Sequence, residues 1–310
     1  MNVVDREFAL LAREVRGKSE EELFEGMKAA FLALPPASAR SLERFFNAYG
    51  YWGRLDAEAG DFEELRLKAN VLHSHIDDFE WVYGLLSDFR SRRTLTAVLA
   101  NWLRFDTALP TRTRETLFDE YFDLDILTCT PDEVVADLGA YVGDTVLSYM
   151  VNYGKNCYKR IYAYEITPSS FDAMRRNLAG FRDIEMRRKG VADVPSRMRV
   201  AVCEASSSAN TLSDAACGEE VEVTTLDLDI TEPISLIIAD IEGGEYAALL
   251  GARRHIGTEH PRLAVSVYHR NEDLFRIPRL ITSLSPAYTR FHLRHRGSPL
   301  YPTELTLFAL

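Results

Sequence analysis

The stretch Asp137-Leu-Gly-Ala-Tyr-Val-Gly-Asp-Thr145 decides the fold of this chain, because it joins a β-rich run to a helical pattern. Gly139 allows a sharp turn and a close approach of a ligand to the backbone, and Gly143 lets the helix begin close to the strand. Free N–H groups at the helix start suit a carboxylate or hydroxyl of a ligand, and Asp137 suits an ammonium group. Alone, this glycine spacing also fits a tight turn that binds nothing.

Short β-rich runs alternate with helical stretches on both sides of this loop. Strands are expected at 133–138, 160–164, 184–191, 234–240 and 262–268, and helices at 142–153, 169–179, 244–255 and up to 284. This alternation predicts an α/β fold, a parallel sheet with helices on both faces. The last two runs, 288–294 and 304–309, have no helix between them and predict an antiparallel hairpin, while 197–202 and 221–225 look like further strands around a polar loop.

Upstream of about residue 130, apolar residues recur at helical spacing. The stripes fall in 24–34, 42–49, 62–72, 79–89 and 95–102. Each stripe gives an amphipathic helix one face to bury, so we expect a helical bundle or cap packed on the sheet. A lid that selects the substrate is the alternative.

Composition and charge narrow the class of protein. The net charge of −11 argues against a nucleic-acid partner, which needs clustered Lys and Arg. The chain shows no apolar signal segment and no run near the ~20 apolar residues of a membrane span, so a cytoplasmic protein without a membrane partner is expected. The four cysteines form no C-x-x-C pair, so neither a zinc site nor a redox motif is expected; they are Cys129, Cys157, Cys203 and Cys217.

The second expected strand ends in Glu165. A carboxylate at that strand end accepts hydrogen bonds from both hydroxyls of a ribose. Alone, Glu165 also fits a solvated strand end, but the glycine loop one crossover earlier favours a ligand that contains adenosine.

Acidic residues and a histidine follow the next two strands. Asp240 closes an apolar strand and is expected to face the ligand crevice, while Glu242 and Glu245 also fit a cap and a first-turn acid of the next helix. His269 follows the neighbouring strand and suits a general base or a metal ligand.

These motifs together resemble the FkbM family of methyltransferases. The matching pieces are 134–145, 162–168, 236–245, 250–252, 266–269 with 272–274, and 304–309, and they lie within about residues 115–310. Two positions depart from the usual family pattern: Ile238 stands where a lysine is common, and Gly244 where alanine is.

The resemblance implies a class I methyltransferase (Rossmann-like) fold with a seven-stranded, mostly parallel sheet. Residues 113–310 would form this domain, which binds S-adenosylmethionine, and residues 1–112 an N-terminal helical extension. The implied reaction is O-methylation of a sugar or small natural product. The methionine end would lie on the loop (Asp137, Gly139, Ala140, Tyr141, Gly143, Asp144, Thr145), the ribose on Glu165, and adenine against Val191 and Ala192.

For catalysis we expect Asp240 or His269 to remove the acceptor proton, with Glu242 beside them. In another version Asp240 and His269 bind Mg²⁺, which lowers the pKa of the acceptor hydroxyl. Two other functions stay open: a nicotinamide-dependent oxidoreductase, against which the missing third glycine counts, and a non-catalytic adaptor whose helices bind a partner. The sequence identifies neither the acceptor nor whether the chain forms a homo-oligomer.

Overall fold

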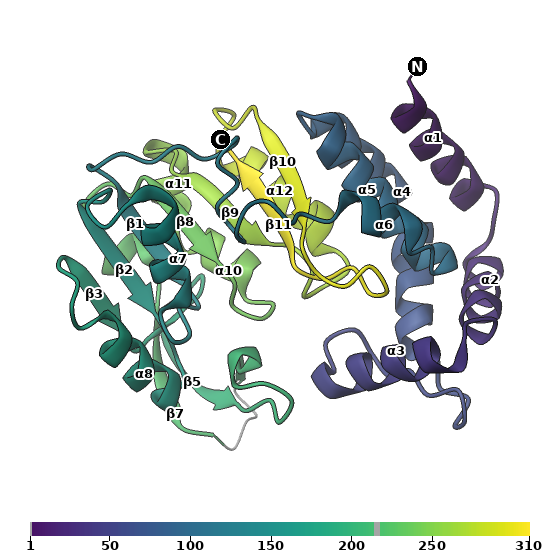
Figure 1. Ribbon diagram of the computed structural model, residues 1–310, viewed down its shortest axis with the longest axis horizontal. Coiled ribbons are helices and arrows are strands. Elements are labelled where there is room, and N and C mark those ends of the chain that lie inside the picture. Colours follow the sequence, from purple (N-terminus) through teal and green to yellow (C-terminus); the bar gives the residue numbers. More distant parts are fainter. Residues whose placement is uncertain (1, 214–217) are drawn as a thin grey trace. The chain divides into compact units, whose positions relative to one another are not determined.

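The β-rich runs form a seven-stranded sheet in the computed structural model, which describes residues 2–213 and 218–310 (Figure 1). The strand order is β10-β11-β9-β8-β1-β2-β3. The strands are β1 (Val134–Leu138), β2 (Arg160–Tyr164), β3 (Ile184–Arg187), β8 (Leu236–Ala239), β9 (Arg262–Ser266), β10 (Phe291–His295) and β11 (Leu305–Ala309). The predicted α/β sheet is confirmed.

Strand order reverses at β1, because β2 and β3 lie on one side of it and β8 and β9 on the other. All four of these pairings are parallel. Right-handed crossovers that leave β1 in opposite directions place their helices on opposite faces. A ligand crevice is therefore expected outside the carboxyl ends of β1 and β8.

The last two strands form the predicted antiparallel hairpin. Arg296 N–H donates to Glu304 O at 3.0 Å, and Thr289 N–H donates to Leu310 O at 3.1 Å, so β10 and β11 run antiparallel. Val267, just after β9, donates to Leu305 at the start of β11 at 2.9 Å. The end of β9 therefore meets the beginning of β11, and β11 runs against its neighbour.

The predicted single strand at 184–191 is wrong, because the chain leaves the main sheet after Arg187. Gly190 and Val191 form β4 (Gly190–Val191) in a second sheet of order β4-β7-β5-β6. A Cβ on Gly190 would lie 2.6 Å from the side chain of Leu212, so the glycine permits this change of sheet. The other strands are β5 (Ser196–Ala201), β6 (Thr211–Ser213) and β7 (Glu220–Thr224), with the short helix η1 (Ser207–Ala209).

Helices connect the strands of the main sheet. They are α7 (Asp144–Tyr153), α8 (Pro168–Leu178), α9 (Leu226–Asp229), α10 (Glu245–Leu250), α11 (Arg253–Thr258) and α12 (Asp273–Leu284). The predicted helix at 244–255 is wrong, since it is broken into α10 and α11. Gly251 lies at the break, where a Cβ would come 2.0 Å from the carbonyl oxygen of Ala192.

The N-terminal segment is helical, as its stripes predict. Its helices are α1 (Val3–Arg16), α2 (Glu20–Leu32), α3 (Pro36–Tyr49), α4 (Glu63–Leu85), α5 (Phe89–Arg104) and α6 (Ala108–Thr113). The two stripes at 62–72 and 79–89 share one helix, α4, which is kinked at His75. α1 has no counterpart among the predicted stripes, although Val4, Phe8 and Leu11 are buried along one face.

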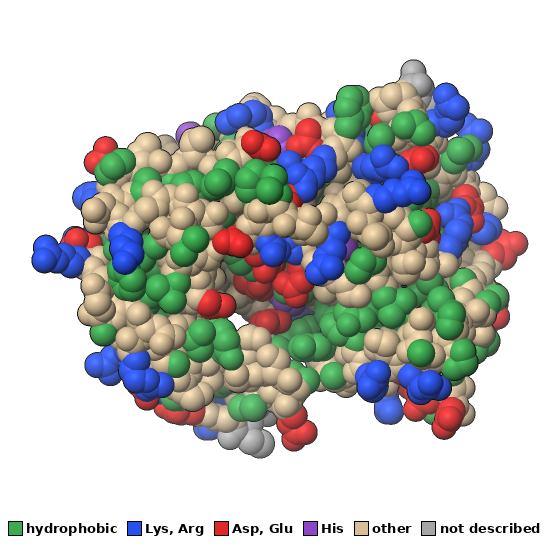
Figure 2. All heavy atoms as spheres, viewed as in Figure 1, with side chains coloured by type: hydrophobic (Ala, Val, Ile, Leu, Met, Phe, Trp, Pro, Cys, Tyr) green, Lys and Arg blue, Asp and Glu red, His purple; other side chains and the backbone are tan. Residues whose placement is uncertain are grey.

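By its contacts the chain separates into two units. The first holds Met1–Thr116, Val267–Pro278 and Arg290–Thr306, and the second holds Leu117–Ser266, Arg279–Thr289 and Leu307–Leu310. Cys129 and Cys157 are free thiols, and Cys217 lies outside the described residues. Within the described ranges, no helix has the length and apolar character to cross a membrane. On the face in Figure 2, Lys and Arg side chains are scattered among acidic ones.

Candidate functional site

The turn after β1 is shaped by Gly139. This residue has φ of +86°, which favours glycine, and a Cβ there would lie 1.9 Å from the carbonyl oxygen of Asp240. Gly139 N–H and Ala140 N–H both donate to Tyr164 O, at 3.1 and 2.8 Å. The turn is thus fixed between the end of β2 and the loop after β8.

Asp137 lies in β1, just before this turn, with a side chain that is 1% exposed. Its Oδ2 has no hydrogen-bond partner among the described residues. Burial, followed by the nearby carboxylates of Asp144 and Asp240, raises the pKa of Asp137 well above its ordinary value. A buried acceptor without a donor costs free energy, so the carboxylate suits a cationic donor from outside the protein.

The rest of the loop closes on itself and leads into α7. Gly143, at φ +85°, donates its N–H to Ala140 O at 2.7 Å and caps the helix. Tyr141 has φ of +44°, and its hydroxyl lies 3.0 Å from Ser207 Oγ. Asp144 is exposed in the first turn, and Thr145 is half-buried beside it. This part of the loop therefore offers both backbone and side-chain groups to a ligand.

Glu165 follows β2 and is largely buried. Its Oε1 accepts a hydrogen bond from Thr167 N–H at 2.6 Å. Burial raises the pKa of Glu165, and the backbone N–H groups of Thr167, Tyr141 and Ile166 partly oppose that rise. These donors fix the orientation of the Glu165 carboxylate at the carboxyl end of β2.

Val191 and Ala192 lie at the change from the main sheet to the second sheet. Val191 is buried in β4, and Ala192 N–H donates to Thr224 O at 2.9 Å. Since that N–H is used, Ala192 offers an adenine ring only its methyl group and the surface beside it.

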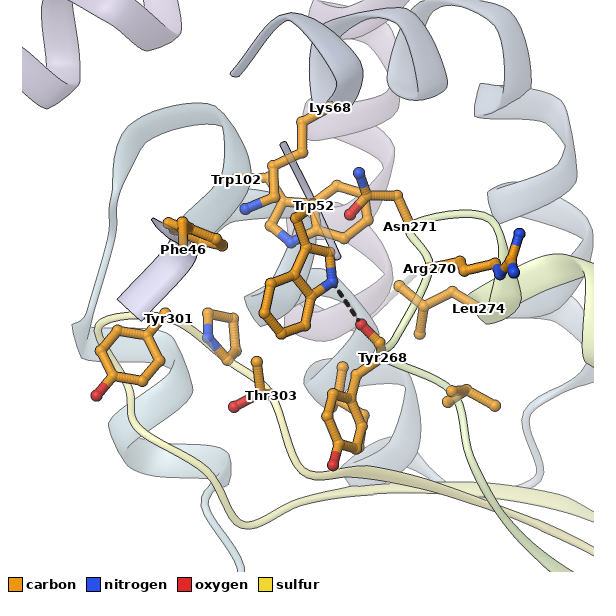
Figure 3. Close-up of a pocket in the computed structure, with 13 residues that line it drawn as sticks. Phe46, Trp52, Lys68, Trp102, Tyr268, Arg270, Asn271, Leu274, Tyr301 and Thr303 are labelled. Carbon is orange, nitrogen blue, oxygen red and sulfur yellow. Dashed lines mark hydrogen bonds between the residues drawn. The ribbon is translucent and has the colours of Figure 1, made fainter. Parts of the chain in front are cut away.

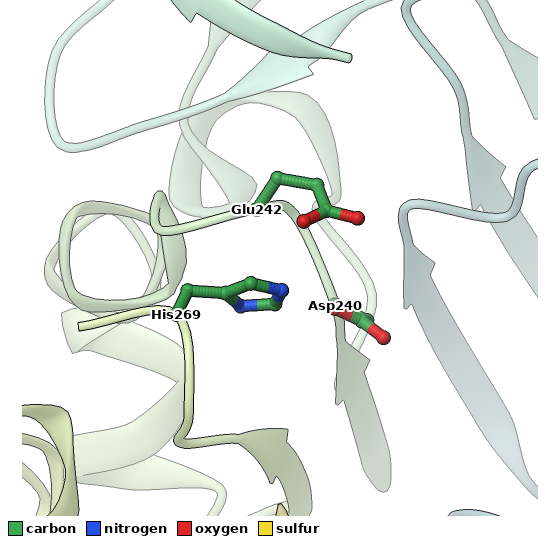
Figure 4. Close-up of side chains that lie close together, drawn as sticks. All are labelled: Asp240, Glu242 and His269. Atoms are coloured by element: carbon green, nitrogen blue, oxygen red, sulfur yellow. The ribbon is translucent and has the colours of Figure 1, made fainter. Parts of the chain in front are cut away.

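The loop after β8 brings two carboxylates together. Asp240 and Glu242 each place an oxygen within 4.8 Å of the other (Figure 4). Glu242 has φ of +57°, which a residue with a side chain rarely adopts, and Gly243 follows at +93°. Backbone strain of this kind costs about 1–3 kcal/mol and is concentrated at functional sites.

Tyr121 holds one of these carboxylates, a role that the sequence pattern does not reveal. Its hydroxyl donates to Asp240 Oδ2 at 2.5 Å and lies 3.3 Å from Ser266 Oγ. Tyr121 stands in an irregular segment at φ +64°, so neither strand nor helix periodicity marks it.

Glu245 stabilises the loop after β8 through buried hydrogen bonds. It is fully buried, and its Oε1 accepts from Ile241 N–H at 2.8 Å and from Gly243 N–H at 3.3 Å. Glu245 is therefore the acid that pairs the loop's backbone donors, and the helix cap considered for Glu242 is wrong, because Gly244 caps α10.

His269 is the third residue after β9 and belongs to the first unit. Its side chain is buried, and the ring of Tyr51 meets it edge-on with centroids 5.8 Å apart. His269 therefore lies on a packed segment that directly continues a strand of the main sheet.

Together, the reversal of strand order, the glycine turn and the acids at the ends of β1, β2 and β8 mark the carboxyl edge of an α/β sheet as the candidate ligand crevice. A family model described as "Methyltransferase FkbM domain" matches residues 137–292, about half of the chain. The chain belongs to this methyltransferase family, and S-adenosylmethionine is the cofactor that membership implies.

One solved structure shares the fold. A methyltransferase FkbM from Methylobacillus flagellatus KT matches with a TM-score of 0.69 and 22% identity, over 88% of this chain and 70% of that one. An rRNA methylase from Streptococcus thermophilus matches at 0.36 and 14%, over 58% and 88%. Aeropyrum pernix fibrillarin with bound S-adenosyl-L-methionine matches at 0.37 and 14%, over 59% and 67%. The last two TM-scores are too low to support an argument, and no curated protein matches.

Proposed function

We propose that this protein is a class I, S-adenosylmethionine-dependent O-methyltransferase that acts on a hydroxyl of a small molecule such as a sugar or natural product. The observation that carries the proposal is the buried Oδ2 of Asp137, which lacks a hydrogen-bond partner at the carboxyl end of β1. The ammonium group of the methionine moiety is the donor that this oxygen requires.

The remaining cofactor contacts follow the crevice from the end of β1 to the second sheet. The loop residues Gly139 to Thr145 hold the methionine end, Glu165 binds the ribose, and Val191 and Ala192 lie against adenine. The position of Glu165 at the carboxyl end of β2 supports the ribose contact, and the used N–H of Ala192 supports an adenine contact through packing.

Charge favours this cofactor over a nicotinamide dinucleotide. Acidic groups are concentrated in the crevice, since Asp144, Asp240 and Glu165 lie close enough to Asp137 to contribute to the rise of its pKa. S-adenosylmethionine brings a sulfonium and an ammonium cation, whereas a dinucleotide brings an anionic pyrophosphate. The acids attract the former and repel the latter.

For the proton we assign His269 as the base and Asp240 as the carboxylate that stabilises the protonated imidazole; Figure 4 draws both with Glu242. In the β8–β9 register Ala239 pairs with Val265, so Asp240 and Ser266 continue neighbouring strands. Neighbouring strands are about 4.8 Å apart, and the three residues from Ser266 to His269 span at most about 10 Å. The chain thus keeps His269 within reach of the crevice.

When bound, the cofactor supplies an electrophilic methyl group whose bond to sulfur breaks as the bond to the acceptor oxygen forms. His269 would accept the one hydrogen of the acceptor hydroxyl, and Asp240, held at Oδ2 by Tyr121, would stabilise the positive charge that His269 gains. His269 takes the proton and returns it to solvent after transfer. Orientation supplies much of the rate, and the base adds about 10²–10⁴-fold.

A divalent cation is the second version of this site. The closeness of Asp240 and Glu242 favours it, since Mg²⁺ prefers carboxylate oxygens. His269 suits Mg²⁺ less well than an oxygen ligand does, so we favour the mechanism with His269 as a general base over the mechanism with a metal ion. Full activity after treatment with a chelator would exclude the metal version alone.

We also propose that residues 1–112 act as a helical cap domain beside the methyltransferase domain 113–310. Residues 267–278 contribute to the same unit as the N-terminal helices, which supports a role for that unit in selecting the acceptor.

The decisive experiment combines ligand titration with an acceptor screen. We expect S-adenosylhomocysteine to bind and NAD not to bind. His269→Ala and Asp240→Asn should each lower methyl transfer at least about 100-fold while S-adenosylhomocysteine affinity changes little. Tight NAD binding without S-adenosylhomocysteine binding would refute the proposed function, and normal turnover in both variants would refute the proton assignment. Cofactor affinity without transfer to any acceptor would favour the adaptor.

A further inference from the structure

The loop after β5, residues 203–210, is joined to the end of β2 by buried hydrogen bonds. Asn210 is 7% exposed, and its Nδ2 donates to Thr167 Oγ1 at 3.0 Å. Its Oδ1 accepts from Cys203 N–H at 2.8 Å. Thr167 in turn donates its backbone N–H to Glu165 Oε1 at 2.6 Å. A chain of contacts within the second unit therefore leads from loop 203–210 to the carboxylate assigned to the ribose.

Asn210 sets the direction of the Thr167 hydroxyl. A backbone N–H can only donate, so Cys203 fixes Oδ1 of Asn210 on its own side and leaves Nδ2 on the side of Thr167. An amide NH₂ group also only donates, so Thr167 Oγ1 accepts there and its own hydrogen remains available for Glu165. Burial raises the pKa of Glu165, and both the N–H and the hydroxyl of Thr167 oppose that rise, which agrees with this direction.

Loop 203–210 also reaches the turn after β1. The hydroxyl of Tyr141 lies 3.0 Å from Oγ of Ser207, which is in η1. Tyr141 belongs to the turn assigned to the methionine end of the cofactor, whereas Glu165 is assigned to the ribose. The loop is therefore connected to both parts of the candidate cofactor site.

Buried polar contacts in the first unit show the ordinary structural case. In the pocket drawn in Figure 3, Trp52 Nε1–H donates to Tyr268 O at 2.8 Å. The buried Lys68 of the same pocket forms an ion pair with Glu64. Neither contact includes a residue assigned to the cofactor. The chain from Asn210 differs, because it ends at the carboxyl end of β2, so ligand binding can test its role.

We propose that Asn210 is a positioning residue of the cofactor site, which acts through Thr167 to hold the Glu165 carboxylate in the orientation that binds the ribose hydroxyls. Hydrogen bonds in a buried network depend on one another, so the loss of the Asn210 side chain releases the Thr167 hydroxyl and, with it, the carboxylate. This inference rests on the proposed function, because that function assigns Glu165 to the ribose of S-adenosylmethionine.

The test compares two ligands by calorimetry: S-adenosylhomocysteine and its 2′,3′-dideoxy analogue, which lacks both ribose hydroxyls. Wild-type protein should bind S-adenosylhomocysteine at least about tenfold more tightly than the analogue. Asn210→Ala should weaken S-adenosylhomocysteine binding about tenfold and leave the affinity for the analogue within about twofold. A side chain with a structural role alone would weaken the binding of both ligands alike.

Thr167 supplies a second set of variants. Thr167→Val keeps the shape of the side chain without its hydroxyl, so it should reproduce the loss seen in Asn210→Ala, and the double variant should lose no more. Thr167→Ser keeps the hydroxyl and should keep the preference for S-adenosylhomocysteine. Asn47→Ala is the matched control, since Asn47 bonds to both backbone groups of Leu55 in the first unit. It should change neither affinity.

Three results would overturn the inference: equal binding of the two ligands by wild-type protein, an unchanged preference in Asn210→Ala or Thr167→Val, and a parallel loss of both ligands in these variants. If Asn210→Ala does not fold, the contrast between Thr167→Val and Thr167→Ser decides. S-adenosylhomocysteine binding by wild-type protein separates the cases: its presence leaves the proposed function standing, and its absence refutes that function first.

Discussion

At the scale of the residue, the buried carboxyl group of Asp137 lowers the free energy of unfolding of the ligand-free protein. Its folded pKa is raised by burial, so the folded chain holds a proton at pH values where the unfolded chain is ionised. The free energy of unfolding therefore falls as pH rises from about 4 through the raised pKa. Asn at this position has no such titration.

We predict that Asp137→Asn raises the free energy of unfolding by about 1–3 kcal/mol at pH 7.5, with a smaller gain at pH 4.5. The same change should weaken S-adenosylhomocysteine binding at least tenfold, since the ammonium group loses its carboxylate. Urea denaturation at three pH values and calorimetry measure both effects. Asp132→Asn, at an exposed neighbouring site, is the control. A destabilised Asp137→Asn that binds normally would show that Asp137 is structural.

Tyr121 acts through Asp240 and is a positioning residue. Tyr121→Phe removes the hydroxyl that donates to Asp240 Oδ2 and leaves the ring in place. We expect methyl transfer to the acceptor from the screen to fall about tenfold, with S-adenosylhomocysteine affinity within twofold of wild type. Tyr153→Phe, which loses a bond to Leu127 O at 3.1 Å, is the control and should keep its rate. A parallel loss in both variants would point to general destabilisation.

At the scale of the element, the turn after β1 depends on how closely it approaches the loop after β8. Gly139→Ala combines backbone strain with a clash against Asp240 O, so we predict a loss of at least about 3 kcal/mol of stability. Gly154→Ala has a similar φ of +98° but open space around it, and should cost about 1 kcal/mol from strain alone. Gly180→Ala has neither problem and should stay within about 0.5 kcal/mol. Equal urea midpoints for Gly139→Ala and Gly154→Ala would exclude the clash.

Strand periodicity predicts β1, β2, β8 and β9 because a sheet covered on both faces needs continuous apolar runs. The breaks at Gly190 and Gly251 escape such reasoning, since each depends on a distant group that approaches the glycine. Sequence periodicity also misses α1, because charged residues are interspersed with its apolar residues. The apolar face of α1 becomes evident only in the packed structure.

The candidate site divides in the same way. Asp137, Glu165 and Asp240 are predictable because they end apolar strands, and strand ends meet at one edge of a parallel sheet. Tyr121, the loop contacts of Glu245 and the buried Asn210 are not, because each gains its role from tertiary contacts. Sequence thus predicts the strand-end acids of the candidate site better than the side chains that hold them.

At the scale of the whole molecule, charge and size set what cofactor binding does to stability. A ligand that binds only the folded state stabilises it by about 2.7 kcal/mol at 100 times its Kd. For a chain of 310 residues this is a rise in Tm of roughly 4 °C. The net charge of −11 acts against a dinucleotide, so NAD at the same concentration should produce no such rise.

We predict that S-adenosylhomocysteine raises Tm by this amount and that the protection is local. Amide hydrogen exchange should slow in 137–145 and around Glu165, where the backbone closes on the cofactor, and should stay unchanged in α1 and α2. Thermal scans with each ligand, followed by hydrogen exchange with mass spectrometry, measure both effects, and Asp137→Asn should reduce the Tm shift by at least about half. Protection spread evenly over the chain would show global stabilisation and would contradict binding in the crevice. A Tm shift with NAD alone would favour the nicotinamide-dependent oxidoreductase instead.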